Sequence, residues 1–501
     1  MKITYISHAT LLIEAGDLRI VTDPWVKGSA YCEQWYLFPK PVAPSLIQDA
    51  DVVLYSHGHE DHLHIESLLT IDSEAKVFYP YSWYPGTPAF FTSLGFKNNN
   101  EILNEQCIEL SKDVRVTYLA NNLDTVMVIE HGSEVLVNIN DALPSASTEM
   151  IGHMLDKIKK RWSNITYVFS SFGSAGYFPN TVHYKDKDDI EIGRLREHVF
   201  LNNFCRIVDE LAPTIAVPFA SDFALLDDRQ RWINDIKFPR HKISDYFIEQ
   251  TENNKVTVAE AYAGDLFELG KQHKASPYHS VFAKQSIKAR IEEDYAIEIE
   301  AKRNPVALDT DTYSALKQKL RKHIERKKGL IPQVIRNKIK FALKLTDSPV
   351  QNWIVVDFRQ GKLGFETSDA MPTDVDLHIE LKSATLQYTL EQEWGGDAIV
   401  IGYGAEIHVY HEDAVRLEME NYCIRLLSRY PNMKEYLPKA PLRGVRYLLS
   451  DSIKRTNLLR QITGKSESRL EYSDQKLGDR PLWLSKGKCE VCKACNIAFQ
   501  N

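Results

Sequence analysis

The stretch that decides the fold is VVLYSHGHEDHLH at residues 52–64. An apolar, β-branched run leads there into a turn that carries His57, His59, Asp61 and His62. His57 and His59 are two residues apart and project to one side of an extended segment, whereas Asp61 and His62 are expected to begin the next helix and turn toward the same point. The pattern predicts a metal site at the end of a strand.

Such a cluster has two interpretations. A lone histidine in a chain with 16 of them is usually an ordinary polar residue. Clustered without a metal, however, these imidazoles would compete for few hydrogen-bond partners. Two imidazoles can hold one divalent ion, and the carboxylate with the third imidazole can hold a neighbouring ion, with positions left open for water, oxygen or substrate. We therefore interpret the four residues as metal ligands, and paired metals would suit hydrolysis and oxygen activation equally.

The chain divides into regions of different patterning. Short β-rich runs fill residues 1–141, and helical periodicity follows at 149–162, 190–211 and 228–236. Strands interspersed with helices indicate an α/β layered domain, and strand-like alternation returns near residue 349 before a helical pattern at 413–430. The predicted regions are a metal-binding domain (1–270), a helical, basic connecting segment (271–348), a smaller α+β domain (349–475) and a cysteine-rich tail (476–501).

The connecting segment is strongly basic over residues 310–345, which are expected to be helical. Its cations include Lys317, Lys319, Arg321, Lys322, Arg326, Lys327 and Lys328. We favour a solvated helix face that joins two domains, with anion binding as the alternative.

Composition limits the function classes. A chain of 501 residues with 44% hydrophobic residues can bury a sizeable core, and its net charge of -7 argues against nucleic-acid binding over the whole surface. No apolar run reaches bilayer length, and the N-terminus reads as a strand rather than a signal peptide. The seven cysteines are odd in number and three crowd the C-terminus, which suits metal binding in a reducing compartment. We expect a cytoplasmic protein without a membrane partner.

Several motifs together resemble the metallo-β-lactamase superfamily. They are HGHEDH, SHATLLIE at 7–14 and TDPW at 22–25. More narrowly, the chain is similar to the branch that contains ascorbate-lactonase-like enzymes and CMP-N-acetylneuraminate hydroxylases. The hydroxylase likeness rests on DPWVKGSAYCEQWYLFP, LDTVMVIEHGSEVLVNINDA, FGSAGYFPNT, VPFASDF and VDLHIELKSATLQYTLEQEWGGDAIVIGYGAEI. The resemblance implies an αββα sandwich followed by a smaller α+β domain.

The resemblance also implies further site residues. Asp141 matches the bridging aspartate of the superfamily and, with Asp61, becomes a candidate catalytic residue; the alternative for Asp141 is a strand-end residue that caps a turn. His8 and Asp23 match positions that orient the metal ligands by hydrogen bonds rather than touch the metal.

Two departures from the hydrolase pattern favour iron over a tightly held zinc pair. Where further histidines are expected, the chain reads LANNLDT and VPFASDF, so Asn121, Asn122, Ser221 and Asp222 stand in their neighbourhoods. We expect Asn121, Asn122 and Asp222 to line the pocket. His183 or His153 could instead fold back to complete the site.

The tail KGKCEVCKACNIAFQN places Cys489, Cys492 and Cys495 at spacing that suits an iron–sulfur cluster or zinc, with a fourth ligand from elsewhere. The alternative is three unrelated exposed thiols, which are a liability on a surface. The resembling hydroxylases carry a Rieske-type iron–sulfur module ahead of the metallo-β-lactamase-like domain. We see no such module here, and expect the C-terminal cysteines to deliver electrons in its place.

The leading functional hypothesis is an iron-dependent oxygenase with one or two iron ions. Its substrate would be a polar metabolite such as a nucleotide-linked or amino sugar, and an electron-transfer protein would be a partner. The alternative is a zinc- or manganese-dependent hydrolase of a lactone, ester or phosphodiester, in which Asp61 or Asp141 positions or deprotonates a metal-bound water.

Overall fold

The computed structural model describes most of the chain up to Leu449. The described residues are 1–121, 124–146, 148–175, 181–184, 188–271, 273–331, 333–348, 350, 352–410, 422–431, 433–436 and 438–449. Asn122, Cys489, Cys492 and Cys495, singled out above, lie outside them.

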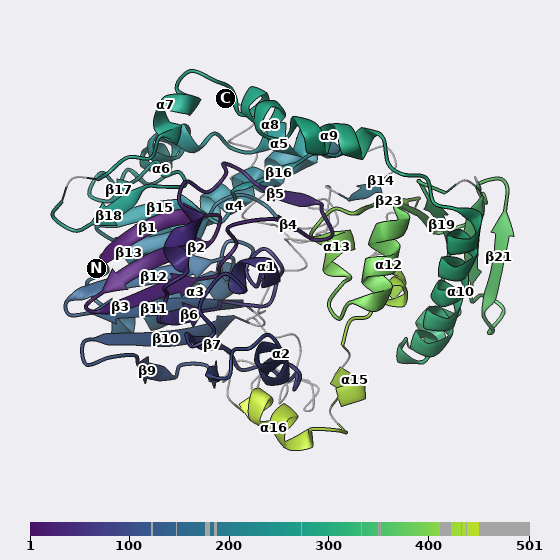
Figure 1. The fold of residues 1–501 in the computed structure, drawn as a ribbon, viewed down its shortest axis with the longest axis horizontal. Coiled ribbons are helices and arrows are strands. Elements are labelled where there is room, and N and C mark those ends of the chain that lie inside the picture. The colour runs from purple at the N-terminus through teal and green to yellow at the C-terminus, as the bar shows by residue number, and fades with distance from the viewer. Residues whose placement is uncertain are drawn as a thin grey trace.

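Two seven-stranded sheets form the first part of the molecule (Figure 1). The first runs β18 (Leu266–Glu268), β1 (Lys2–Ser7), β2 (Thr10–Ala15), β3 (Leu18–Thr22), β6 (Val52–Leu54), β7 (Lys76–Pro80) and β8 (Asn99–Ile102). The second runs β17 (Thr257–Val258), β15 (Ile215–Phe219), β13 (Tyr167–Ser171), β12 (Glu134–Asn140), β11 (Asp124–His131), β10 (Val114–Asn121) and β9 (Cys107–Glu109). Glycines with positive φ, Gly16 and Gly132, make the two-residue hairpin turns that follow β2 and β11.

A continuous apolar core lies between these two sheets. Alternate residues of β1 and β2 point into it, including Ile3, Tyr5, Leu11 and Ile13, and they meet side chains of the second sheet such as Phe169. Because both sheets bury one face here, the register of each strand is fixed by its alternating pattern.

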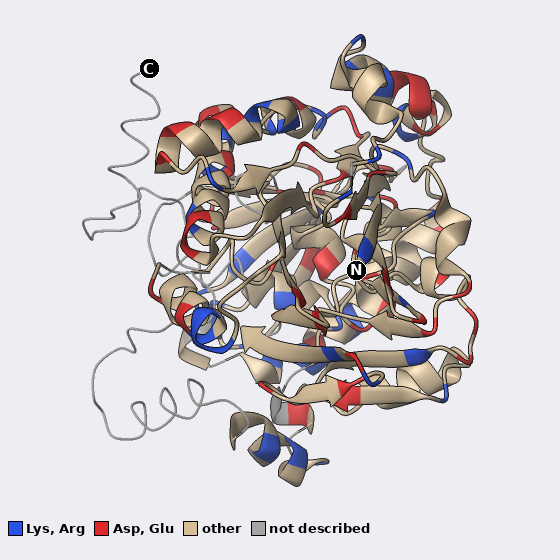
Figure 2. Ribbon diagram, turned by 90° about the vertical axis from the view of Figure 1, so that its left-hand side faces the viewer, with Lys and Arg blue, Asp and Glu red and all other residues tan. Residues whose placement is uncertain are grey.

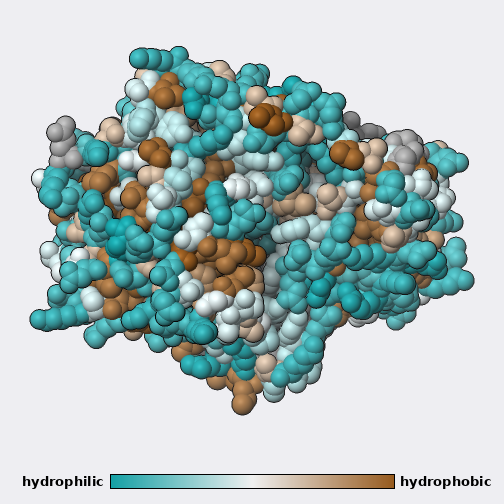
Figure 3. Space-filling view, in the orientation of Figure 1, coloured by the Kyte–Doolittle hydropathy of each residue, from teal (hydrophilic) through white to brown (hydrophobic). Residues whose placement is uncertain are grey.

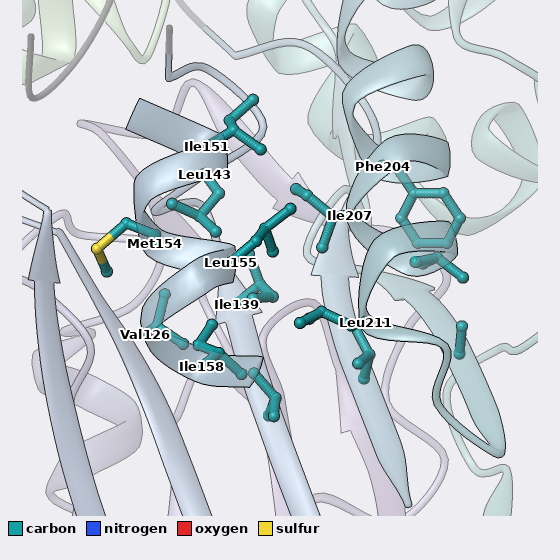
Figure 4. Close-up of a cluster of buried hydrophobic side chains, with 14 of the residues drawn as sticks. Val126, Ile139, Leu143, Ile151, Met154, Leu155, Ile158, Phe204, Ile207 and Leu211 are labelled. Carbon is teal, nitrogen blue, oxygen red and sulfur yellow. The ribbon is translucent and has the colours of Figure 1, made fainter. Parts of the chain in front are cut away.

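Helices cover the outer faces of both sheets. α3 (Thr148–Arg161), α4 (Asp189–Leu211) and α6 (Ile243–Thr251) pack on the second sheet through a core in which α3 and α4 meet over the strands (Figure 4). α1 (Ile65–Leu68) and α2 (Thr87–Ser93) flank the first sheet, where Leu68 and Phe91 join Val53 and Val77. The order helix, sheet, sheet, helix confirms the expected αββα sandwich.

A six-stranded sheet forms the second part of the molecule, on the right of Figure 1. Its order is β14 (Val182–Tyr184), β23 (Ala405–Val409), β22 (Leu377–Leu381), β19 (Lys340–Leu345), β20 (Trp353–Asp357) and β21 (Gly364–Ser368). α10 (Thr310–Lys327) and α12 (Ser383–Glu391) pack against it through a shared core. β14 comes from the region predicted as the first domain, and the domain limits themselves stay a prediction.

The basic segment is only partly helical. α10 buries Tyr313, Leu316, Leu320 and Ile324, so it is an amphipathic helix packed on a sheet. The helical prediction for 310–345 is wrong at its end, where residues 340–345 form β19, because Phe341, Leu343 and Leu345 alternate toward the core with the period of a strand.

A small sheet and short helices connect the two parts. The sheet consists of β16 (Phe223–Leu225), β5 (Trp35–Leu37) and β4 (Ser29–Ala30). The remaining helices are α5 (Trp232–Ile236), α7 (Tyr278–Phe282), α8 (Ile287–Asp294), α9 (Ala296–Arg303), α11 (Gln333–Arg336), α13 (Asp397–Val400), α15 (Met433–Tyr436) and α16 (Pro441–Leu449), with 3-10 turns η1 (Pro44–Ile47), η2 (Arg240–Lys242) and η3 (Lys328–Leu330). Residues 422–427 are also helical.

Charged residues of both signs are interspersed over the side of the molecule seen in Figure 2. Within the described part of the chain, every helix is too short or too polar to cross a bilayer.

Candidate metal centre

The HGHEDH turn follows the buried strand β6. His57, Asp61 and His62 are buried and His59 is half-buried. The helix starts at Ile65 rather than at Asp61 as predicted, because the His64 side chain caps it by accepting the Ser67 N–H. Asp61 and His62 instead lie in a turn, in which the N–H of His62 donates to the carbonyl of His59 at 3.0 Å.

Donor atoms from this turn converge with a carboxylate at the end of β12. His57 Nε2 lies 2.8 Å from His59 Nδ1. His62 Nε2 lies 3.5 Å from Asp61 Oδ2 and 3.4 Å from Asp141 Oδ2. Among the described residues, the buried His62 Nε2 has no hydrogen-bond partner, although two carboxylates face it. A nitrogen lone pair and two carboxylates around one point fit a cation better than a hydrogen-bonded core.

Asp124, which lies in the LANNLDT stretch but is not among the predicted ligands, belongs to the same cluster. It begins β11, and its carboxylate groups with His57 and His59, with 4.0 Å between His57 Nε2 and Asp124 Oδ1. Burial raises the pKa of Asp124 to about 6, helped by the carboxylates of Asp141 and Asp61 and opposed by His59 and His62. The available signal in the sequence was an acidic residue at the start of a β-rich run.

His8 and Asp23 lie against the predicted ligands. His8 Nε2 is 2.9 Å from Asp61 Oδ2. Asp23 accepts the N–H of Ser56 at 2.8 Å and its hydroxyl at 2.7 Å, and His62 Nδ1 lies 3.1 Å from the same carboxylate. Both residues have φ of 40°, a left-handed conformation uncommon outside glycine that often marks functional sites. Their role in orienting the ligands stays a prediction, and this geometry is compatible with it.

Burial and nearby carboxylates shift the pKa values of His57 and His62 in opposite directions. Burial, with the neighbouring imidazoles of His62 and His59, lowers the pKa of His57 well below its ordinary value. Burial alone would also lower the pKa of His62, but the Asp61, Asp141 and Asp23 carboxylates raise it well above the ordinary range. Burial would raise the pKa of Asp61, yet His62 and His8 hold it far below normal.

Two predicted pocket residues have other positions. Asp222 forms a buried ion pair with Arg240 and accepts the Tyr5 hydroxyl, whereas its neighbour Ser221 reaches the cavity wall. The buried Asn121 amide donates to the Ala142 carbonyl. Neither side chain is among those that line the cavity described below, and a role for them in a substrate pocket stays a prediction.

The two histidines that could have folded back to complete the site lie elsewhere. His183 lies on β14, its ring 5.0 Å from that of His408 in the six-stranded sheet, and His153 lies on α3. Neither belongs to a His, Cys, Asp or Glu group close enough to hold an ion among the described residues.

A cavity of about 1380 Å³ opens beside the cluster and is walled by both parts of the chain. Figure 3, drawn in the orientation of Figure 1, shows a hollow near the middle of the molecule with apolar surface beside it. The six-stranded part and the helical residues after it contribute Lys327, Tyr388, Trp394, Asp397, Arg425, Arg429 and Tyr430 to the wall. The hollow therefore offers cationic and aromatic groups near the acidic cluster.

Residues of the second part also approach the turn directly. The Tyr388 hydroxyl donates to Glu60 at 2.9 Å, and burial raises the pKa of Glu60 to about 7. Tyr31 donates to Asp61, and Gly402 packs on Tyr31. The arrangement of the metal motif thus depends on contacts from residues more than 300 positions away.

The sandwich and this cluster define a class of protein. Residues 2–196 match the family described as "Beta-lactamase superfamily domain". This part of the chain is thus similar to domains of that superfamily, and its αββα sandwich and its cluster of histidines and aspartates agree with the match.

Part of the chain is also similar to a group of named proteins. The cytidine monophosphate-N-acetylneuraminic acid hydroxylase of Asterias rubens is 28% identical over 238 residues, which are 44% of this chain and 35% of that protein. The chain spans less than half the length of the hydroxylases of this name that it matches. Over nearly half of its length the chain is thus similar to these hydroxylases, as its motifs indicated.

The chain is also similar to parts of solved structures. A CmlA beta-hydroxylase is 18% identical, with a TM-score of 0.38 and coverage of 54% of each chain. An isothiocyanate hydrolase from Delia radicum gut bacteria is 14% identical, with a TM-score of 0.37 and coverage of 54% of this chain and 99% of that one.

Proposed function

We propose that this protein is an iron-dependent oxygenase that hydroxylates a polar metabolite, such as a nucleotide-linked or amino sugar. The substrate class follows from the name of its relatives, with which the chain shares limited identity. Lys327, Arg425 and Arg429 at the cavity wall suit an anionic substrate. The cytoplasmic location expected from the cysteines forms part of the same proposal.

The observation that carries the proposal is the abundance of carboxylates in the donor set. Asp124 supplies an oxygen beside His57 and His59, close to where a hydrolase of the superfamily was expected to have a further imidazole. Asp61 and Asp141 add two more carboxylates around His62. A set of mixed imidazole and carboxylate ligands with open positions is typical of non-haem iron.

The chain's own residues would orient these ligands. The Ser56 hydroxyl donates to Asp23 at 2.7 Å, so its oxygen is free to accept from His57 Nδ1, 2.9 Å away. Asp23 likewise accepts from His62 Nδ1. With their proton on Nδ1, both imidazoles would have Nε2 free to bind a metal. Bound iron would supply oxygen activation, for which electrons must arrive from outside the substrate.

Asp61 is held from two sides. The His8 imidazole lies at one carboxylate oxygen and the Tyr31 hydroxyl at the other, so the side chain has a fixed direction before any metal binds. The bulky rings at the cavity wall would limit the access of water to the substrate.

Electron delivery by Cys489, Cys492 and Cys495 stays a separate prediction, with an iron–sulfur cluster as the preferred centre and an electron-transfer protein as its donor. Iron with acid-labile sulfide in anaerobically purified protein is the expected result. Protein that contains neither would contradict this role for the cysteines.

The test of the main proposal is oxygen consumption by iron-loaded protein with a chemical reductant and a panel of nucleotide-linked and amino sugars. We expect substrate-dependent uptake and incorporation of labelled oxygen into the product. The matched control is the double variant His57→Ala/His59→Ala, which should lose both. Activity with zinc or manganese, without oxygen, on a lactone, ester or phosphodiester would instead establish the hydrolase alternative.

A further inference from the structure

A second group of nitrogen and oxygen donors lies around β18, the edge strand of the first sheet, and α7. Asp265 precedes β18, His273 lies in the following loop and His279 lies in α7. His279 Nε2 is 2.9 Å and 3.1 Å from the two oxygens of Asp265, and His273 Nε2 is 3.2 Å from Oδ1. This cluster, the 265/273/279 cluster, shares no residue with the HGHEDH site.

The carboxylate of this cluster is rigidly placed. Asp265 is fully buried, and backbone N–H groups donate to it at 2.6 Å from Tyr262 and at 2.6 Å from Ser276. Metal-binding carboxylates are commonly fixed in this way by hydrogen bonds from outside the coordination sphere.

Each imidazole is also held by an aromatic ring. Phe267 stacks on His273 with 4.7 Å between ring centroids and an interplanar angle of 11°. Tyr262 meets His279 edge-on at 4.9 Å. The two imidazoles therefore converge on Asp265 through packing that does not depend on their hydrogen bonds.

Hydrogen bonding alone accounts poorly for His273. Asp265 Oδ1 accepts the Ser276 N–H at 2.6 Å and also has His279 Nε2 at 3.1 Å and His273 Nε2 at 3.2 Å, so three groups approach its two lone pairs. In a tetrahedral zinc site with metal–ligand distances of about 2.0 Å, neighbouring donor atoms lie about 3.3 Å apart. The distances from the two imidazole Nε2 atoms to the Asp265 oxygens, 2.9–3.2 Å, are close to that value.

We propose that Asp265, His273 and His279 bind a zinc ion, with water completing the coordination. Zinc suits two imidazoles and one carboxylate, and the partial exposure of both histidines, 36% and 27%, leaves a path for the ion. The bound ion fastens the loop and α7 to the edge of the first sheet, whose strand β1 pairs with β18. The proposal does not depend on the activity of the HGHEDH site.

Zinc retention tests the assignment. The full-length protein is loaded with zinc, passed through gel filtration and analysed for metal beside His273→Gln and His279→Gln. Each variant should retain about one zinc fewer per chain than the parent, whatever the HGHEDH site and the cysteines contain. The matched control is His241→Gln, at an exposed histidine outside every candidate metal group, which should retain the parental amount.

A second measurement covers the case in which a variant fails to fold. Acylation of histidines in the parent protein, read by peptide mass spectrometry, should slow at least about tenfold at His273 and His279 when zinc is present. Unchanged zinc content in folded variants overturns the proposal, as does equal labelling of both histidines with and without zinc.

Discussion

Asp124 places a carboxylate beside the imidazoles of His57 and His59, where its charge is expected to strengthen metal binding. Asp124→Asn keeps the shape of the side chain and removes the charge. Because anionic oxygen is a better ligand for iron than an amide, iron retention should fall at least about tenfold while the fold persists. Competition with a chelator, followed by metal analysis, measures the change.

The control for this prediction is Asp113→Asn, at an exposed aspartate in the loop before β10. It should leave iron retention at the parental level. Equal retention in Asp124→Asn and the parent would show that this carboxylate is not a ligand.

The positions of some residues could be predicted from the sequence, and those of others could not. The HGHEDH side chains are contiguous, so local spacing alone predicted that they would converge, and the structure brings them together. Asp222 has an ordinary local context, and only the fold reveals its partner Arg240. Asp124 escaped notice because its signal is one acidic residue at a strand start, which is common in proteins.

His323 of α10 forms a hydrogen bond with the segment that follows the helical residues 422–427. Its Nε2–H donates to the Ser428 carbonyl at 2.9 Å, and Arg326 donates to its Nδ1 at 3.2 Å, so the imidazole is neutral. Burial, with the nearby cations, lowers the pKa of His323 from 6.5 to about 4. The unfolded chain then binds the proton more readily, and stability falls as the pH drops from about 6.5 toward about 4.

We expect this histidine to remove about 2 kcal/mol of unfolding free energy between about pH 7 and about pH 5. Urea unfolding at both pH values measures the loss. His323→Gln can still donate to Ser428 but cannot be protonated, so its stability should depend less on pH by that amount. The same pH dependence in both proteins would rule out His323 as the cause.

Elements with strong periodicity were predicted well. α3 and α4 were expected at 149–162 and 190–211, and each begins one residue earlier, with α4 capped by Asp188. β19 was missed because its six residues continue a basic helical pattern in the sequence. Only pairing with β20 and β22 reveals them as a strand.

For the whole molecule, the sandwich was predicted because several motifs resemble one superfamily. Its union with the six-stranded sheet was not predictable, since β14 pairs with β23 across more than 200 residues and no local signal marks that pairing. The contact of Tyr388 with Glu60 and that of Gly402 with Tyr31 also join residues far apart in the sequence, so no local signal marks them. The second part of the chain therefore shapes the site as well as the cavity wall.

Gly402→Ala tests this dependence on the second part. A Cβ at this position would overlap the Cβ of Tyr31 and lie 3.0 Å from the Ala398 carbonyl oxygen, so Tyr31 must move. Tyr31 donates to Asp61, and its displacement should weaken metal retention severalfold, with a loss of about 1–3 kcal/mol in unfolding free energy from overpacking. Gly329→Ala, where an added Cβ meets nothing within 4 Å, is the matched control. If Gly402→Ala loses stability but binds iron like the control, the six-stranded part supports the fold without positioning Asp61.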